Sequence, residues 1–390
     1  MIDSAALARD AAALVQVPSV TGSERAAMER LAELAAGLGL DAELHEHDLA
    51  PLRAHPSHPG EEAPRDELVG LTVTRPGPPG APRLCLNGHL DVVAPGTQEW
   101  RLGQWSGALE DGFLHGRGSV DMKGAVVAAL HALASAPDPG GEVVLMAVSS
   151  EEDGGLGTFA ALERDDRFDA CLIPEPTGFD VVCAQAGALT FSGEVRGRAA
   201  HAALRLEGES AIDLYLDVHR ALAEHERRVN ADPAHPLMRE LELPYPLSVG
   251  RLEAGEWSSS VPDRARFEGR LGVRVGESLD DAAAGLRDAL NGLPVELRFE
   301  GGRYAPGETP AGHPFARLVL DSFPVSRPVG GSYGSDMRLF CERGIPCVMA
   351  GPGGLELAHA VDERVAVADL VRLSEAILRV VERFGSTLGG

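Results

Sequence analysis

The feature that most constrains the fold is an apolar run, EVVLMAV, at residues 142–148. A run without polar alternation is typical of a strand covered on both faces, in the middle of a parallel sheet. Such a strand requires helices on either side, and residues 23–38 and 121–136 have the Ala- and Leu-rich spacing of helices. The proline- and histidine-rich residues 49–67 have no periodicity and are predicted to form a surface loop. We therefore expect an α/β domain with a mostly parallel sheet flanked by helices.

The pattern changes after about residue 184. Residues 188–198 alternate as a half-exposed strand, and helical patterns follow at 208–230 and 278–292. With the intervening strands, the order β-α-β-β-α-β is that of a ferredoxin-like α+β unit. From about residue 300 the chain returns to the first pattern. The sequence thus predicts one domain from residues 1–183 and 300–390, interrupted by an inserted domain at 184–299.

Length and composition restrict the class of protein. A chain of 390 residues is too long for one ordinary core and suits two domains. The 59 acidic and 35 basic residues give a net charge of −24, which disfavours binding to phosphate backbones. Neither a membrane span nor a signal-peptide pattern is found. The five scattered cysteines form no CxxC pair, so we expect a reduced, cytoplasmic protein without a thiolate zinc site.

The first candidate for chemistry is the pair His89 and Asp91 in NGHLDVV. Side chains two residues apart on a strand point to the same side of the sheet. A metal-bound imidazole usually donates its second N–H to a carboxylate, which Asp91 could supply. An HxD triplet is common by chance, so the pair alone establishes nothing.

Further carboxylates and a histidine lie at strand ends or in glycine-rich turns. Glu151 and Glu152 follow the buried run, at the carboxyl edge where open α/β sheets bind ligands, although a solvated acidic loop would look the same. Glu175 ends another apolar strand. Asp121 could instead be a helix N-cap, and His359 a surface or capping residue. Together these residues form a His/carboxylate set without cysteine, which suits catalytic zinc, manganese or cobalt.

Five segments together identify a family resemblance: NGHLDVV, HGRGSVDMKGAVV, AVSSEEDGGLGT, CLIPEPTG and GPGGLELAHAVDERV. In this order they resemble the metallopeptidase family of acetylornithine deacetylase, succinyl-diaminopimelate desuccinylase, aminoacylase and glutamate carboxypeptidase. The likeness covers essentially the whole chain. It implies that residues 1–183 and 300–390 form a catalytic di-metal domain, and that 184–299 form a lid and dimerisation domain of a homodimer.

The resemblance also implies two Zn²⁺ per subunit, with Co²⁺ or Mn²⁺ as alternatives. Asp121 matches the carboxylate that bridges the two metals. His89 and Glu175 match the remaining ligands of one metal, and Glu152 and His359 those of the other.

Two neighbouring residues take catalytic roles in this scheme. Asp91 resembles the residue that orients His89. Glu151 matches the general base, which moves a proton from the attacking water to the leaving amine.

Candidates for contacts with substrate are implied by the same resemblance. His201, in GRAAHAA, matches a histidine that reaches the partner subunit's active site and stabilises the oxyanion; a capping or packing histidine is the alternative. Arg338, in GSDMRLF, resembles an arginine near the substrate pocket, although a plain salt bridge is nearly as good an interpretation. Arg270 and Ser260 are weaker candidates: Ser260 stands where relatives often have asparagine, and EGRLGV departs from the usual DxR pattern.

The leading functional prediction is hydrolysis of the amide bond in a small N-acyl amino acid, of the deacetylase or desuccinylase type. A dipeptidase or carboxypeptidase with the same centre is the second, and nothing local separates the two. A non-catalytic binding protein of the same fold is the third, and the intact Glu151 argues against it. We expect no nucleic-acid or membrane partner.

Overall fold

The fold is that of a computed structural model, which describes residues 2–136, 139–323 and 326–388. The chain divides into two compact units, which we call unit 1 and unit 2. Unit 1 comprises Met1–Cys183, Glu308–Val329 and Ser335–Gly390, and unit 2 comprises Ala184–Gly307 and Gly330–Gly334. The chain therefore leaves unit 1 after Cys183 and returns to it at Glu308, with a short second excursion.

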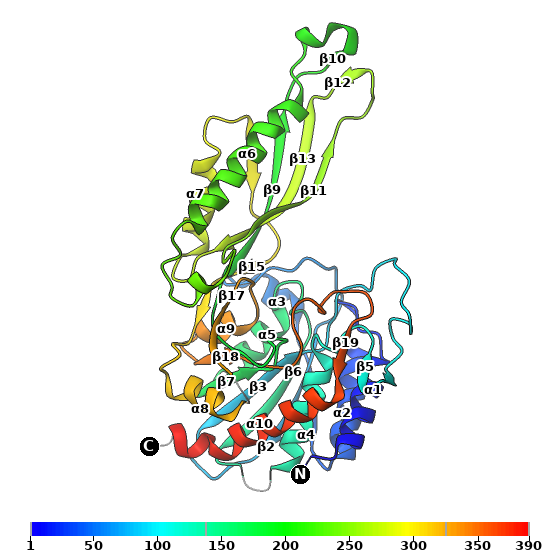
Figure 1. The fold of residues 1–390 in the computed structure, drawn as a ribbon, viewed down its shortest axis with the longest axis vertical. Coiled ribbons are helices and arrows are strands. Elements are labelled where there is room, and N and C mark those ends of the chain that lie inside the picture. Colours follow the sequence, from blue (N-terminus) through cyan, green and yellow to red (C-terminus); the bar gives the residue numbers. More distant parts are fainter. Residues whose placement is uncertain (1, 137–138, 324–325, 389–390) are drawn as a thin grey trace. The chain divides into compact units, whose positions relative to one another are not determined.

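Unit 1 is built on a mixed sheet, to which nine strands of the described chain belong (Figure 1). Its order is β1-β2-β6-β3-β7-β18-β8-β16, with β17 beside β8. These strands are β1 (Ala42–Glu46), β2 (Val69–Arg75), β3 (Arg83–His89), β6 (Glu142–Val148), β7 (Ala170–Ile173), β8 (Val181–Gln185), β16 (Gly307–Glu308), β17 (Pro328–Gly331) and β18 (Cys347–Met349). The expected α/β fold is confirmed, and the apolar run forms β6, in the interior of the sheet.

The sheet is less parallel than the sequence led us to expect. The pairs β6–β3, β3–β7 and β7–β18 are parallel, whereas β1–β2, β2–β6 and β18–β8 are antiparallel. Antiparallel neighbours need no crossover helix, and β1 and β2 are joined by a segment whose helix, α3 (Leu49–Arg53), is a single short one. The mostly parallel description therefore holds for the centre of the sheet alone.

Helices α1, α4 and α10 pack against one another beside the sheet (Figure 1). Asp3 begins α1, because its carboxylate accepts hydrogen bonds from the N–H groups of Ala5 and Ala6. Residues 123–133 of α4 are all buried, as the apolar sequence of this segment predicts. The helices of unit 1, besides α3, are α1 (Ser4–Val15), α2 (Arg25–Gly37), α4 (Lys123–Ser135), α5 (Leu156–Arg164), α8 (Pro314–Ser322), α9 (Met337–Cys341) and α10 (Val367–Leu388). A small sheet adds β4 (Ala108–Glu110), β5 (Phe113–His115) and β19 (Arg364–Ala366).

The segment at residues 49–67, predicted to be a surface loop, is only partly one. It begins with α3, and Arg65 near its end is 5% exposed. The guanidinium of Arg65 is buried because it pairs with Asp153, at 2.9 Å. A lone arginine in a polar stretch gives no sign of such a distant partner, so the sequence could not reveal this contact.

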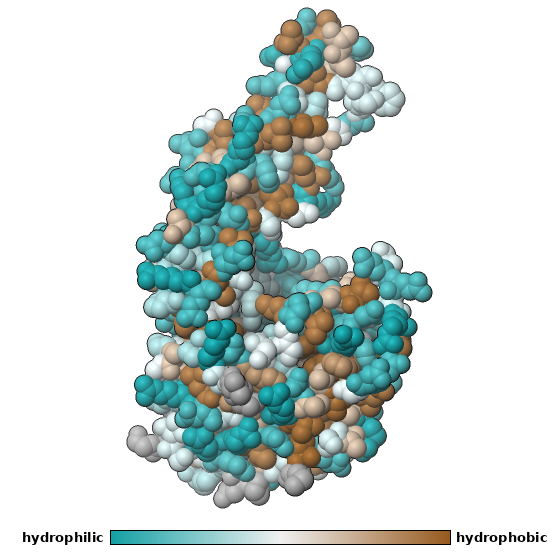
Figure 2. Space-filling view, viewed as in Figure 1, coloured by the Kyte–Doolittle hydropathy of each residue, from teal (hydrophilic) through white to brown (hydrophobic). Residues whose placement is uncertain are grey.

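Unit 2 has the β-α-β-β-α-β order that the sequence indicates. Its antiparallel sheet runs β11-β13-β9-β14, and the burial of β9 alternates from residue to residue. Phe191, Phe267 and Tyr215 pack in its core. Figure 2 shows mostly hydrophilic side chains over α6 and α7, as expected of helices that bury one face. The main elements are β9 (Gly187–Arg196), α6 (Ala211–Asn230), β11 (Leu247–Ala254), β13 (Arg264–Val273), α7 (Leu279–Ala289) and β14 (Val295–Arg298).

Short elements complete unit 2. They are β10 (Ala200–His201), β12 (Ser260–Val261), β15 (Arg303–Tyr304) and the 3₁₀ helices Ala202–Glu207 and Met238–Glu240. In the described part of the chain, no helix combines the length and apolar character that crossing a membrane would require.

Candidate metal centre

Three parallel strands of unit 1 deliver polar residues to one edge of the sheet. His89 is the last residue of β3, Glu151 and Glu152 follow β6, and Glu175 follows β7. Because the carboxyl ends of parallel strands meet at the same edge, these side chains converge. The glycine-rich turn before α4 adds Asp121.

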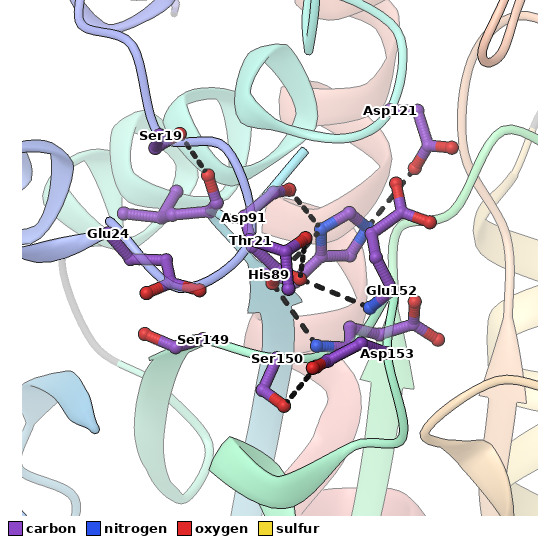
Figure 3. A network of polar contacts seen from close by, with 12 residues as sticks. Ser19, Thr21, Glu24, His89, Asp91, Asp121, Ser149, Ser150, Glu152 and Asp153 are labelled. Atoms are coloured by element: carbon purple, nitrogen blue, oxygen red, sulfur yellow. Dashed lines mark hydrogen bonds and ion pairs between the residues drawn. The ribbon is translucent and has the colours of Figure 1, made fainter. Parts of the chain in front are cut away.

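The convergence is close enough to define a site, and Figure 3 shows three of its members, His89, Asp121 and Glu152. Nε2 of His89 lies 3.1 Å from Oδ1 of Asp121 and 3.8 Å from Oε1 of Glu175. Nε2 of His359 lies 3.5 Å from Oδ2 of Asp121 and 3.1 Å from Oε1 of Glu152. All five predicted ligands are thus brought together. The two oxygens of Asp121 face different histidines, and each histidine is also close to a second carboxylate.

These spacings fit the ligands of metal ions. Nitrogen and oxygen ligands lie about 2.0–2.2 Å from zinc, so two donors in a tetrahedral arrangement are about 3.3 Å apart. The four separations bracket this value, and donor atoms of His89, Asp121 and Glu152 all lie within 4.8 Å of one another. The donor types, imidazole and carboxylate, suit zinc, cobalt or manganese.

The electrostatics of the cluster also favour cations. Burial, with the nearby charge of Asp121, raises the pKa of Glu175 from 4.5 to about 8. Burial likewise raises the pKa of Glu152, and it raises that of Glu151 well above its usual value. Several buried carboxylates in one place are costly unless positive charge compensates them. Two divalent ions would balance the charges of Asp121, Glu151, Glu152 and Glu175.

Asp91 occupies the predicted position but uses a different atom from the one we expected. Nδ1 of His89 lies 2.8 Å from the backbone carbonyl oxygen of Asp91 and 3.7 Å from its carboxylate. In the neutral imidazole, this carbonyl accepts a hydrogen bond from the Nδ1–H group, which leaves Nε2 without a proton and able to bind a metal. The carboxylate instead accepts hydrogen bonds from the backbone N–H groups of Glu151, at 3.2 Å, and Glu152, at 3.1 Å.

Asp153, the third acidic residue of the EED segment, has a role that the sequence did not reveal. Its carboxylate accepts hydrogen bonds from Arg65, the hydroxyl of Ser150 and the backbone N–H of Ala63. Ser150 has a φ of 68°, which is unfavourable for a residue with a side chain. The Asp153 network therefore anchors a strained turn directly before Glu151.

The structure places Arg338 inside unit 1. The residue is 1% exposed, and its Nη2 donates to the carbonyl oxygen of Gly154 at 2.6 Å. This bond supports the turn that follows Glu151 and Glu152. A contact between Arg338 and a substrate carboxylate stays a prediction.

The other predicted residues belong to unit 2. His201 and Ser260 are exposed, directly paired partners on β10 and β12. Nδ1 of His201 accepts a hydrogen bond from the N–H of Ala203 at 3.2 Å, which places the ring proton of the neutral form on Nε2. The Arg270 guanidinium is 5.6 Å from the centre of the Tyr304 ring. Nδ1 of His201 therefore acts as a cap, as the alternative interpretation predicted, whereas Nε2 carries the proton and can act as a hydrogen-bond donor.

Comparison with known proteins agrees with the geometry. The family model for peptidase family M20/M25/M40 matches residues 85–383. The succinyl-diaminopimelate desuccinylase of Methylorubrum populi is 32% identical, over 96% of this chain and 97% of the relative. An M20 family metallo-carboxypeptidase from Sulfolobus solfataricus has a similar structure, with a TM-score of 0.77, 16% identity and coverage of 99% of this chain and 100% of the other. A tripeptidase from Staphylococcus aureus has a TM-score of 0.74, 20% identity and the same coverage. The family predicted from the motifs is confirmed: the chain belongs to the M20/M25/M40 family of metal-dependent peptidases and amidohydrolases.

Proposed function

We propose that the chain is a di-metal amidohydrolase that removes an acyl group from a small N-acyl amino acid. The observation that carries the proposal is the arrangement around Asp121, whose two oxygens lie 3.1 Å from Nε2 of His89 and 3.5 Å from Nε2 of His359. This is the arrangement needed by a carboxylate that bridges two metals. Glu175 and Glu152 complete the two sides. We propose Zn²⁺ as the metal, with Co²⁺ or Mn²⁺ as alternatives.

The residues of the site divide the chemistry between them. When bound, a metal pair would polarise the amide carbonyl and lower the pKa of a water from 15.7 to about 7. Glu151 accepts a proton from this water as its oxygen attacks the carbonyl carbon. It then passes the proton to the amide nitrogen as the C–N bond breaks, which yields a carboxylic acid and a free amine. Burial raises the pKa of Glu151, which makes its carboxylate a stronger proton acceptor than an ordinary glutamate and supports its role as general base.

The proposed class of substrate is supported by the similar proteins. The desuccinylase of Methylorubrum populi matches nearly the full chain, and we infer a desuccinylase- or deacetylase-type substrate for this one. The second candidate is a dipeptidase or carboxypeptidase with the same centre, which the structural likeness to a tripeptidase and a metallo-carboxypeptidase supports. A non-catalytic binding protein has less support, because Glu151 accompanies a complete ligand set.

We also propose that unit 2 serves as the lid and dimerisation domain of a homodimer. Leu206 is 92% exposed and Trp257 is 71% exposed, and Figure 2 shows apolar side chains near the end of unit 2 that carries β10 and β12. Exposed apolar residues of this size favour contact with another protein surface. In such a dimer His201 would donate from Nε2 to the oxyanion of the partner's substrate. Arg270 and Ser260 remain proposed contacts to substrate.

The test combines metal content with a substrate panel. Purified enzyme is assayed for bound metal by mass spectrometry and for hydrolysis of N-succinyl amino acids, N-acetyl amino acids and dipeptides, with chelator-treated enzyme as the control. We expect two metal ions per chain and the highest kcat/KM on an N-acyl amino acid. A preference for dipeptides would favour the peptidase, and bound metal without hydrolysis of any substrate would favour the binding protein.

A further inference from the structure

Behind the metal centre lies a buried ion pair that neither motif analysis nor the proposed mechanism uses. Glu363 is fully buried, and both of its carboxylate oxygens accept hydrogen bonds. Oε1 accepts from the backbone N–H groups of Val120, at 2.9 Å, and Asp121, at 3.2 Å. Oε2 accepts from Nη1 of Arg117, at 2.7 Å, and from the N–H of Gly118, at 3.1 Å. A single carboxylate therefore fixes the turn that presents Asp121.

Arg117, the other member of the ion pair, contacts the segment that carries His359. Nη2 of Arg117 donates to the backbone carbonyl of His359 at 3.1 Å. The Arg117 side chain is 3% exposed, and its guanidinium lies 5.2 Å from the centre of the Trp100 ring. Arg117 thus joins two ligand segments that are 242 residues apart in the sequence.

The backbone of His359 needs such support. Its φ is 60°, in the left-handed region that residues with side chains rarely adopt. Conformations of this kind persist only where surrounding contacts hold them. The Arg117 bond is attached to the carbonyl of that same residue.

We propose that Arg117 and Glu363 are positioning residues of the metal pair, Glu363 acting through Asp121 and Arg117 through His359. The inference rests on the proposed di-metal function and adds the residues that fix its ligands. It also assigns the two residues different effects. Glu363 holds the carboxylate shared by both metals, whereas Arg117 holds a ligand of only one.

Two conservative variants separate these effects. In Glu363→Gln an amide NH₂ group faces backbone N–H donors, so Asp121 loses part of its support and both metals should bind more weakly. In Arg117→Lys the positive charge beside Glu363 is kept, but one ammonium group cannot span both Glu363 and the His359 carbonyl. This change should weaken only the metal held by His359 and Glu152.

The experiment starts from cobalt-loaded enzyme, which is titrated with a chelator while the visible cobalt absorption and the bound metal are recorded. We expect Glu363→Gln to lose both ions at chelator concentrations about 10–100-fold lower than wild type, and Arg117→Lys to lose one ion early, with a changed spectrum for that ion. Asp10→Ala is the matched control: it removes the 2.8 Å contact with His131 between α1 and α4, and it should lower Tm without changing the titration.

The outcomes distinguish this inference from the proposed function. If the variants have a lowered Tm but bind metal with wild-type affinity and give wild-type cobalt spectra, Arg117 and Glu363 stabilise the fold without positioning the metal ligands. If Glu363→Gln does not fold, the metal affinity and the cobalt spectrum of Arg117→Lys alone decide whether these residues position the metal ligands. Wild-type enzyme that binds no cobalt would instead overturn the proposed di-metal function.

Discussion

The carboxylate of Asp91 accepts a hydrogen bond from the backbone N–H of Glu151, at 3.2 Å. Glu151, the predicted general base, is therefore held by Asp91, the residue that was predicted to orient His89. Because the same carboxylate also accepts the N–H of Glu152, one buried group fixes both the proposed base and a proposed ligand. Asp91 thus links the end of β3 to the residues that follow β6, whereas the sequence predicted only a contact with the side chain of His89.

Replacing the base should separate chemistry from metal binding. Glu151→Gln keeps the shape of the side chain but cannot accept a proton, so we expect kcat to fall at least about 100-fold with two metals still bound. Glu152→Gln, one position away, should instead weaken binding of one metal. Turnover of Glu151→Gln within a few-fold of wild type would show that the base is another residue.

The oxyanion role of His201 can be tested against a histidine with the same local bond. We expect His201→Ala to lower kcat about 100-fold or more, with little effect on metal content, because one oxyanion donor is lost. His313 also accepts a backbone N–H at its Nδ1, at the start of α8, so His313→Ala controls for the loss of a cap. Loss of metal from His201→Ala would make it a ligand and would contradict the assignment.

Asp153 should matter for stability more than for metal affinity. Asp153→Asn removes the negative charge nearest to the buried Arg65, at 2.9 Å. The carboxylates that remain beside Arg65 are more distant, at 3.4 Å for Glu24 and 3.9 Å for Glu61. We expect the free energy of unfolding to fall by about 3 kcal/mol in urea denaturation. Glu163→Gln breaks a more exposed pair with Arg343 and should cost under about 1 kcal/mol. Equal losses in the two variants would mean that the buried pair contributes no more than the exposed one.

The sequence predicted those parts of the fold whose signals are local. The apolar run at 142–148 and the helical spacing at 121–136 correspond to β6 and α4. The strand β1, at Ala42–Glu46, was not predicted from the sequence, because it is short and mostly exposed and therefore lacks a buried apolar face. The antiparallel edges depend on how strands pair across the sheet, which no single segment reveals.

Prediction of the site had a similar limit. Strand-end positions made a carboxylate cluster plausible, and family resemblance supplied the bridging role of Asp121. Arg117 and Glu363 were missed because their contact joins residues 246 positions apart and leaves no local pattern. The carbonyl contact of Asp91 was missed for another reason: a sequence shows side-chain types, whereas backbone atoms form this bond.

A buried carboxylate near the site should make stability depend on pH. The Glu24 side chain is fully buried; its Oε1 accepts the N–H of Gly22, and among the described residues its Oε2 has no hydrogen-bond partner. Burial, with the nearby charge of Asp91, raises the pKa of Glu24 from 4.5 to about 7. The folded state therefore holds this proton more tightly than the unfolded state. The resulting stabilisation is complete below pH 4.5 and is lost as the pH rises through about 7.

Glu24→Gln is neutral at every pH and keeps an oxygen for Gly22. Relative to wild type, we expect the variant to gain stability between pH 5 and pH 8, by at most about 3 kcal/mol. Urea unfolding at both pH values, with chelator present throughout to remove metal effects, measures this difference. Glu67→Gln, which removes a more exposed carboxylate paired with Arg25, should show no comparable change between the two pH values. A Glu24→Gln difference that is the same at pH 5 and pH 8 would mean that Glu24 does not titrate in this range, and its buried charge would then have to be compensated by Arg65, whose Nη1 lies 3.4 Å from Oε1.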